Sequence, residues 1–86
     1  MQKKNSDDTL DLHGYKYEEA LSELDRFINN AIMNRIESVK IIHGKGTGIL
    51  KEAVCNYLEN SELVLSFESN FPYNCFGTTS AYLIKI

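Results

Sequence analysis

A chain of 86 residues is long enough for one domain with one small hydrophobic core, and its hydrophobic fraction of 43 % excludes a disordered chain. The formal net charge of −3 means that any surface attracting a polyanion must be local, because the overall field repels one. The two cysteines form no Cys-x-x-Cys pair, which excludes a cysteine metal framework, and no apolar run reaches the roughly 18 residues that span a bilayer.

The start of the chain, residues 1–8, is polar throughout. We expect this stretch to be a linker or a leftover of cloning rather than a signal peptide, and we expect the folded domain to cover residues 9–86. The two cysteines are typical of reduced thiols, and we expect a cytoplasmic protein.

The first two predicted elements are a strand and a helix. Residues 9–13 alternate apolar with polar side chains and stop at a glycine, which is typical of a strand. Asp11 and His13 therefore share the face opposite the two leucines of this strand. Apolar residues then recur at helical spacing between Ala20 and Ile36, which predicts a helix of about five turns.

The remaining segments are, in chain order, a strand, a glycine-rich loop, a helix, a strand, a loop with the only proline and a last strand, at residues 38–43, 44–48, 49–58, 63–67, 71–77 and 80–86. The element order is thus βαβαββ. Strand–helix–strand units of this length place parallel strands side by side with right-handed crossovers. We predict an α/β fold, specifically a two-layer α+β sandwich in which a four-stranded mixed sheet carries both helices on one face.

The only two histidines, His13 and His43, each end a predicted strand and precede a glycine. If the two strands are parallel neighbours, both His-Gly pairs lie at the carboxyl edge of the sheet, where open α/β sheets bind ligands. Adjacent strands are about 4.8 Å apart, so the two imidazoles could face one small group. The alternative is that each histidine only hydrogen-bonds a loop carbonyl.

The loop after His43 has the composition of an anion site. Gly44, Gly46 and Gly48 permit positive φ angles and a close backbone approach, and the loop leads into a helix N-terminus with its unpaired N–H groups. Lys45 adds a charge, although the spacing is not that of a Walker loop. A tight strand-to-helix turn without a ligand is the alternative.

Asp11 could orient His13 or an attacking water as part of a general base, or it could be a solvated residue of an edge strand. With the two histidines it could also hold a divalent cation, although three such residues make no metal motif. Tyr15, Tyr17 and Tyr73 lie in or beside loops and could stack on bases.

Two motifs of this chain resemble the Smr (small MutS-related) domain. They are the Leu-Asp-Leu-His-Gly run of residues 10–14 and the His-Gly-Lys-Gly-Thr-Gly run of residues 43–48. The segment from Glu18 to Phe27 is similar to the family's first helix, and the similarity extends from about residue 9 to the end of the chain. The domain occurs alone and at the C-terminus of the second bacterial MutS paralogue, and this chain resembles the second arrangement, excised from its larger MutS-like protein.

The resemblance implies a fold similar to the C-terminal domain of a bacterial translation initiation factor. It also implies DNA nicking or RNA cleavage, in recombination control, DNA repair or ribosome rescue. The implied partners are DNA or RNA, the ribosome and the rest of a MutS-like chain, with no membrane, and we expect the isolated domain to be a monomer. The loop at residues 70–77 departs from the family, because relatives carry a glycine-rich run where only Gly77 remains here.

We therefore predict an endonuclease domain in which Asp11 and His13 activate a nucleophile, while His43 stabilises charge or protonates the leaving oxygen. The residues predicted to hold the nucleic acid are Lys16, Gly44, Lys45, Gly46, Thr47 and Gly48. No cofactor is evident, and weak assistance by Mg²⁺ or Mn²⁺ stays open. The alternatives are a non-catalytic nucleic-acid or ribosome-binding module of a larger MutS-like ATPase, and a protein-interaction domain without nucleic-acid contact.

Overall fold

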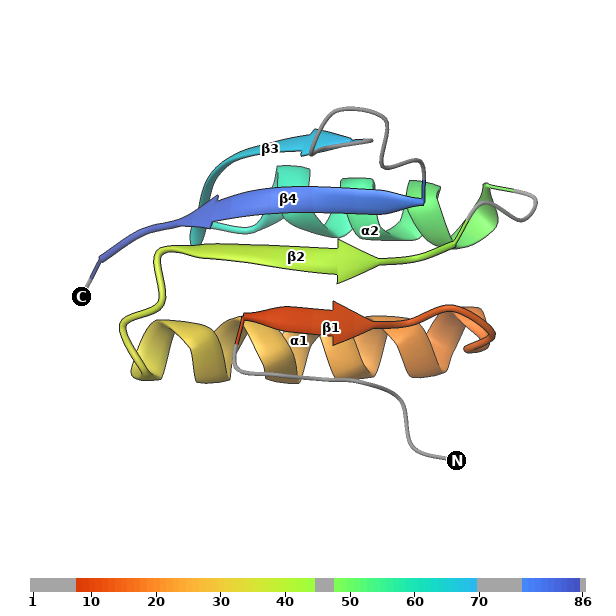
Figure 1. The fold of residues 1–86 in the computed structure, drawn as a ribbon, viewed down its shortest axis with the longest axis horizontal. Helices are drawn as coiled ribbons and strands as arrows, with labels where there is room; N and C mark the ends of the chain where they lie inside the picture. Colours follow the sequence, from red (N-terminus) through yellow and green to blue (C-terminus); the bar gives the residue numbers. More distant parts are fainter. Residues whose placement is uncertain (1–7, 45–47, 70–76, 86) are drawn as a thin grey trace.

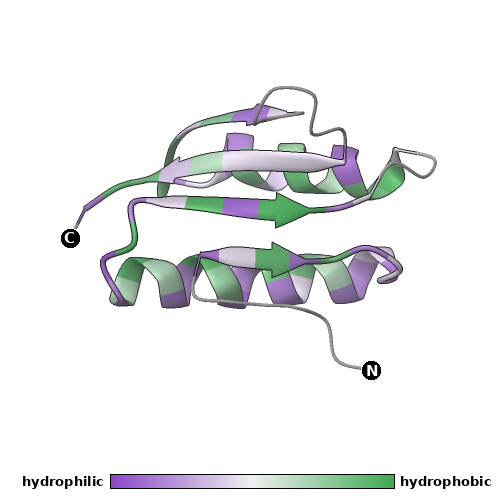
Figure 2. Ribbon diagram, viewed as in Figure 1, coloured by the Kyte–Doolittle hydropathy of each residue, from purple (hydrophilic) through white to green (hydrophobic). Residues whose placement is uncertain are grey.

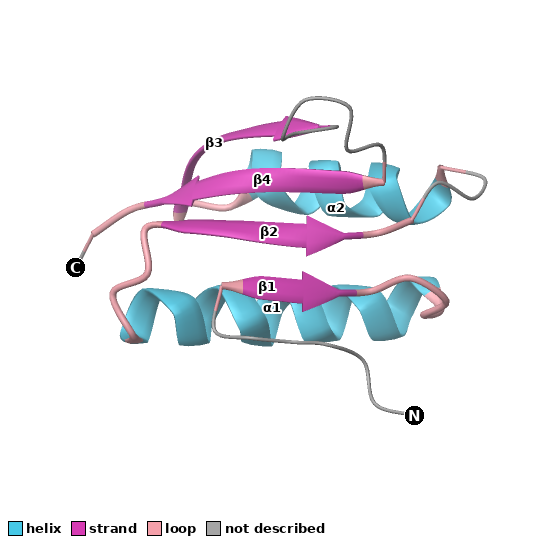
Figure 3. Cartoon of the chain, viewed as in Figure 1, coloured by secondary structure: helices cyan, strands magenta, loops and turns pink. Residues whose placement is uncertain are grey.

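The structure, a computed structural model, describes residues 8–44, 48–69 and 77–85. Within these residues it contains six elements, namely β1 (Thr9–Asp11), α1 (Tyr17–Met33), β2 (Ser38–Ile42), α2 (Ile49–Asn60), β3 (Val64–Ser69) and β4 (Thr78–Leu83). Figures 1 and 3 show both helices on the same side of the sheet. The predicted order βαβαββ and the two-layer arrangement are confirmed.

The sheet has the strand order β1-β2-β4-β3 and is mixed, as predicted. β1 and β2 are parallel neighbours, while β4 runs antiparallel to β2 on one side and to β3 on the other. The expectation of parallel neighbours thus fails for the second strand–helix–strand unit, because β4 lies between β2 and β3. Burial gives the physical reason: β4 carries Ala81 and Leu83 at 0 % and 2 % exposure, whereas β3 has no buried residue and takes the sheet edge.

The core lies between the sheet and the two helices. Its largest fully buried apolar side chains come from five of the six elements or the residue just after them: Leu12, Leu24, Ile28, Val39, Ile41, Val54, Leu58 and Leu83. Each such side chain contributes about 1.5–3 kcal/mol when it is removed from water. Figure 2 shows the matching alternation of hydrophobic and hydrophilic residues along the helices. Because Leu10 and Leu12 belong to this core, Asp11 lies on the opposite face of β1.

Several element ends differ from the sequence prediction. α1 begins at Tyr17, three residues before Ala20, the first apolar residue of the predicted helical pattern, and the Lys16 N–H donates to Glu19 Oε1 at 3.3 Å in place of a conventional cap. The helix ends at Met33, and Arg35 takes a left-handed φ of 61°, so that Ile36 lies outside the helix. No glycine marks this stop in the sequence, which is why the apolar spacing suggested a longer helix.

At the start of the domain, Asp8 already takes part in the sheet, because its carbonyl accepts the Lys40 N–H at 2.8 Å. The rest of the predicted linker, residues 1–7, lies outside the described residues. None of the helices in the described ranges is long and apolar enough to cross a bilayer.

Candidate functional site

The carboxyl ends of β1 and β2 lie at the same edge of the sheet (Figure 1). Asp11 pairs in register with Ile42, so that His13 and His43 both follow just beyond the ladder. A Cβ atom placed on Gly44, whose φ is +82°, would lie 3.4 Å from the Cβ of His13. The structure therefore brings the two His-Gly segments side by side, as the parallel pairing predicts.

Asp11 holds His13 through two contacts. Its Oδ1 accepts the backbone N–H of His13 at 3.1 Å and lies 2.5 Å from the ring Nδ1. The Asp11 side chain is only 15 % exposed, whereas the His13 side chain is 62 % exposed. The carboxylate is thus largely covered and fixes the orientation of an imidazole that faces solvent. Because Nδ1 contacts Asp11, proton transfer between His13 and a ligand would use Nε2.

His43 has a different environment, with only 4 % of the residue exposed. Its Nδ1 lies 3.0 Å from the carbonyl oxygen of Gly44, and its Nε2 lies 2.9 Å from Thr79 Oγ1. A carbonyl only accepts, so Nδ1 carries the proton, and the Nε2 of the neutral ring accepts from the Thr79 hydroxyl. This ring therefore points toward β4, not toward His13.

The electrostatics of His43 agree with this assignment. Burial lowers the pKa of His43 from its ordinary value of 6.5, and the charge of Lys51 acts in the same direction, while the hydrogen bond to Gly44 opposes both. His43 is accordingly a neutral, internally bonded ring. The predicted proton transfer from His43 to a leaving oxygen gains no support from this geometry, which favours a role in holding the Gly44 peptide.

The polar contacts continue inward from His43. Thr79, which is 0 % exposed, has its Oγ1 3.5 Å from Ser69 Oγ, and that oxygen lies 3.2 Å from Cys55 Sγ. β4, β3 and α2 are thus joined by a short chain of side-chain contacts that ends at the site. None of these three partners has a local sequence signal, because they lie 12 to 36 positions away from His43 along the chain.

A cleft of about 660 Å³ lies in front of the two histidines. Lys16 and Tyr17 line it from the start of α1, and Gly48, Ile49 and Lys51 line it from the start of α2. Gly48 has a φ of +88° and is the N-cap of α2, so the positive end of the helix dipole faces this cleft. Among the described residues that line it, two side chains are cationic and none is a carboxylate.

Lys16, Gly44 and Gly48 thus line the cleft, as the predicted binding residues would. Lys45, Gly46 and Thr47, as well as Tyr73, lie outside the described residues. Lys51 was not among the predicted site residues, although its place in the first turn of a helix after a glycine loop could have suggested it. It supplies the second positive charge of the cleft.

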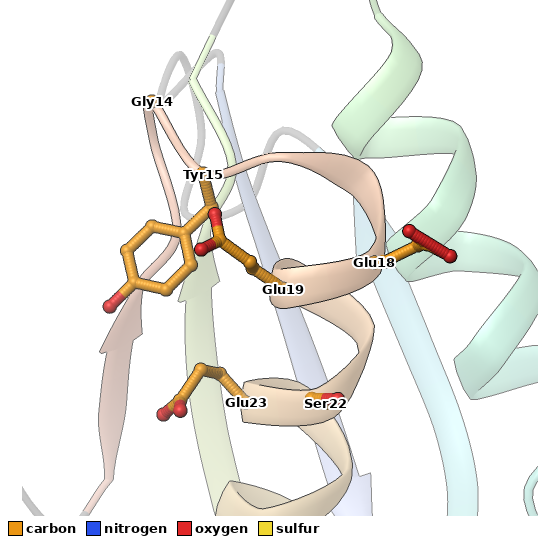
Figure 4. Close-up of a pocket in the computed structure, with 6 residues that line it drawn as sticks. All are labelled: Gly14, Tyr15, Glu18, Glu19, Ser22 and Glu23. Carbon is orange, nitrogen blue, oxygen red and sulfur yellow. The ribbon is translucent and has the colours of Figure 1, made fainter.

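A second hollow, of about 700 Å³, lies on the other side of the turn after β1. Figure 4 shows Tyr15 there beside Glu19 and Glu23, with Glu18 farther round the helix. Three carboxylates make this hollow unfavourable for a phosphate group. They do not converge either, since the described residues contain no group of three acidic, histidine or cysteine side chains that could hold a metal ion.

Three comparisons relate this chain to known proteins. The family model described as Smr domain matches residues 10–86. Two proteins named Endonuclease MutS2 match closely: that of Staphylococcus haemolyticus is 49 % identical over 75 residues, and that of Levilactobacillus brevis is 51 % identical over 72 residues. These matches cover 86 % and 84 % of this chain but only 10 % and 9 % of the relatives, so the chain spans about a tenth of their length.

Two solved structures share the fold. The Smr domain of Thermus thermophilus MutS2 superposes with a TM-score of 0.84 at 32 % identity, covering 90 % of this chain and 98 % of that one. YdaL of Escherichia coli, a stand-alone small MutS-related protein, gives the same TM-score at 26 % identity and covers 96 % of this chain and 69 % of that one.

Proposed function

Since this chain belongs to the Smr domain family, we propose that it is an endonuclease domain that hydrolyses phosphodiester bonds of DNA or RNA as part of a larger MutS-like protein. The observation that carries the proposal is the Asp11–His13 pair, an oriented and exposed imidazole at the mouth of a cationic cleft. The name of the Staphylococcus haemolyticus relative, Endonuclease MutS2, supports the same class of activity.

The nucleic-acid phosphate would bind between Lys16 and Lys51, at the N-terminus of α2. Two lysines and the positive end of a helix dipole attract an anion even though the chain as a whole carries a net charge of −3. The Gly44 peptide, held by His43, borders the same cleft, so a phosphate there would lie within reach of His13.

In the proposed reaction, His13 Nε2 takes a proton from a water molecule as its oxygen attacks phosphorus. Asp11 stabilises the imidazolium that forms, in the manner of a carboxylate behind a catalytic histidine. The bond from phosphorus to the leaving oxygen then breaks, and that oxygen receives a proton from the imidazolium or from solvent. Lys16 and Lys51 would stabilise the charge that develops on the phosphoryl oxygens.

Assistance of the cleavage reaction by a divalent cation is a separate proposal. In the described residues only Asp11 and His13 lie together as possible ligands at the cleft, and Asp11 already accepts two contacts from His13. We assign no reaction step to a metal, and a chelator tests whether one is needed.

The test compares the parent domain with Asp11→Asn and His13→Ala on supercoiled plasmid, single-stranded DNA and structured RNA, each with and without chelator. We expect each variant to lose roughly 100- to 10,000-fold in cleavage rate, the usual contribution of an oriented general base, while gel-shift binding stays intact. Glu59→Gln, a change at an exposed position of α2, is the matched control and should keep the parent rate. Cleavage by Asp11→Asn at the parent rate would refute the assignment.

The second candidate function is a binding module that grips nucleic acid or ribosomal RNA without cutting it. The observation that favours it is the state of His43, whose ring nitrogens both have internal partners, so that the cleft contains only one imidazole able to move a proton to solvent. Binding by the parent domain with no cleavage of any of the three substrates would select this function.

A further inference from the structure

Two exposed apolar residues form a ridge along the cationic cleft. It consists of Tyr17, the first residue of α1, and Ile49, the first residue of α2, which are 50 % and 58 % exposed. Both side chains line the cleft, and both also line a neighbouring hollow of about 90 Å³ that reaches Ala53 and Asn56. The ridge therefore separates two cavities and exposes apolar surface to each.

The charges around the ridge are uneven. Lys16 and Lys51 stand on the cleft side, whereas Glu52 lines the small hollow on the other side. A ligand that contacts both the lysines and the ridge would combine an anionic group, placed toward the lysines, with a flat apolar face that covers the tyrosine ring. A nucleotide has this chemistry, since every base offers such a face and carries a phosphate beside it.

We propose that the Tyr17–Ile49 ridge receives one unpaired base of the bound nucleic acid while Lys16 and Lys51 hold its phosphate. The site then takes single-stranded segments in preference to continuous duplex, because the base faces of a duplex are already covered by their neighbours. The cleft volume of about 660 Å³ lies in the range of sites that enclose small organic ligands. This inference rests on the proposed function, since it names the class of nucleic acid that the same cleft prefers.

The test measures binding of short oligonucleotides that carry the fluorescent base 2-aminopurine, whose emission reports stacking. DNA and RNA strands are each used alone and in perfectly paired duplexes of the same sequence. We expect the parent domain to bind the single strands more tightly and to change their emission. Tyr17→Ser should weaken single-strand binding by about 5- to 150-fold, the usual loss for one stacked base, and leave duplex binding unchanged.

Two further variants make the result specific. Tyr17→Phe keeps the ring and should bind like the parent, which separates stacking from any effect of the hydroxyl group. Tyr82→Ser removes another tyrosine, 36 % exposed on the sheet strand β4 and not part of the cleft, and should have no effect.

The outcomes separate this inference from the proposed function. If the parent domain binds neither single strands nor duplexes, the proposed function fails and the inference falls with it. If it binds both equally, or if Tyr17→Ser weakens both to the same extent or neither, only the stacking inference is overturned. If Tyr17→Ser weakens binding of the DNA strand but not of the RNA strand, or the reverse, the affected nucleic acid is the one that supplies the stacked base.

Discussion

Replacing Thr79 by valine tests the hydrogen bond that fixes His43. The change keeps the size of the side chain and removes the hydroxyl group that donates to His43 Nε2 at 2.9 Å. Thr79 is 0 % exposed and His43 only 4 %, so no water can take the place of the lost donor. A buried acceptor left without a partner costs about 1–3 kcal/mol. In a domain of this size that loss lowers the melting temperature by roughly 4–8 °C for each kcal/mol.

The assay is thermal and urea unfolding, followed by circular dichroism. It is carried out near neutral pH, at which His43 is neutral. Thr78→Val is the matched control, because Thr78 is the preceding residue of the same strand, lies on its opposite face and is only half-buried. We expect the control to change stability by no more than about 0.5 kcal/mol. If Thr79→Val is as stable as the control, the hydrogen bond does not hold His43 and the positioning role assigned to that ring is refuted.

The remaining predictions concern pH, salt and the helix pair. Burial lowers the pKa of His43. The buried neutral ring therefore makes its full contribution to stability above the unfolded pKa of 6.5, and this contribution is lost as the pH falls below that value. Over this range the urea midpoint should fall less steeply for His43→Gln than for the parent. Lys16→Ala combined with Lys51→Ala should flatten the salt dependence of single-strand binding by a slope of about 1.4, measured by fluorescence anisotropy. Tyr57→Phe removes the 2.7 Å hydrogen bond from the Tyr57 hydroxyl to Asp25, which links α2 to α1, and should cost about 0.5–1.5 kcal/mol in urea unfolding.

Each of these three results has a clear contradiction. If the urea midpoints of the parent and of His43→Gln fall equally with pH, the loss of stability in acid comes from the protonation of a group other than His43. An unchanged salt slope in the double lysine variant would place the phosphate outside this cleft. A Tyr57→Phe domain as stable as the parent would show that the Tyr57–Asp25 hydrogen bond adds no net stability, because water takes the place of the hydroxyl at the Asp25 carboxylate.

The edge of the sheet that carries the site was predictable from sequence, because a histidine and a glycine end each of two strands that an α-helix connects. Strand–helix–strand units favour parallel neighbours, which is confirmed for β1 and β2 although not for β2 and β3, and the carboxyl ends of parallel neighbours meet at one edge of the sheet. The contact between Asp11 and His13 was also predictable in kind, since residues two apart on a strand share a face.

The partners of His43 were not predictable in this way. Thr79 lies 36 positions later in the chain, and it reaches His43 only because β4 inserts between β2 and β3 and pairs Thr79 with Ile41. That insertion depends on the relative burial of β3 and β4, a property of the whole core that no local pattern reports. The left-handed residue after α1 was missed for a related reason: Arg35 adopts a conformation that the sequence rules reserve for glycine.

The same topology makes the two histidines unequal. Alternation along β1 puts Asp11 on the face away from the helices, and His13 beyond it is exposed. Alternation along β2 puts His43 with Val39 and Ile41, on the face that the helices cover, and it is buried. An imidazole that moves protons needs access to its ligand, and one that fixes a peptide needs exclusion of water. Two neighbouring strands that end at the same edge supply both environments about 4.8 Å apart, provided that one histidine lies on the open face of the sheet and the other on the covered face.

The Gly44 peptide connects the two histidines, since the His43 ring holds its carbonyl while its Cα stands against His13. A disturbance at His43 should therefore reach the chemistry through the position of His13, not through the loss of a proton donor.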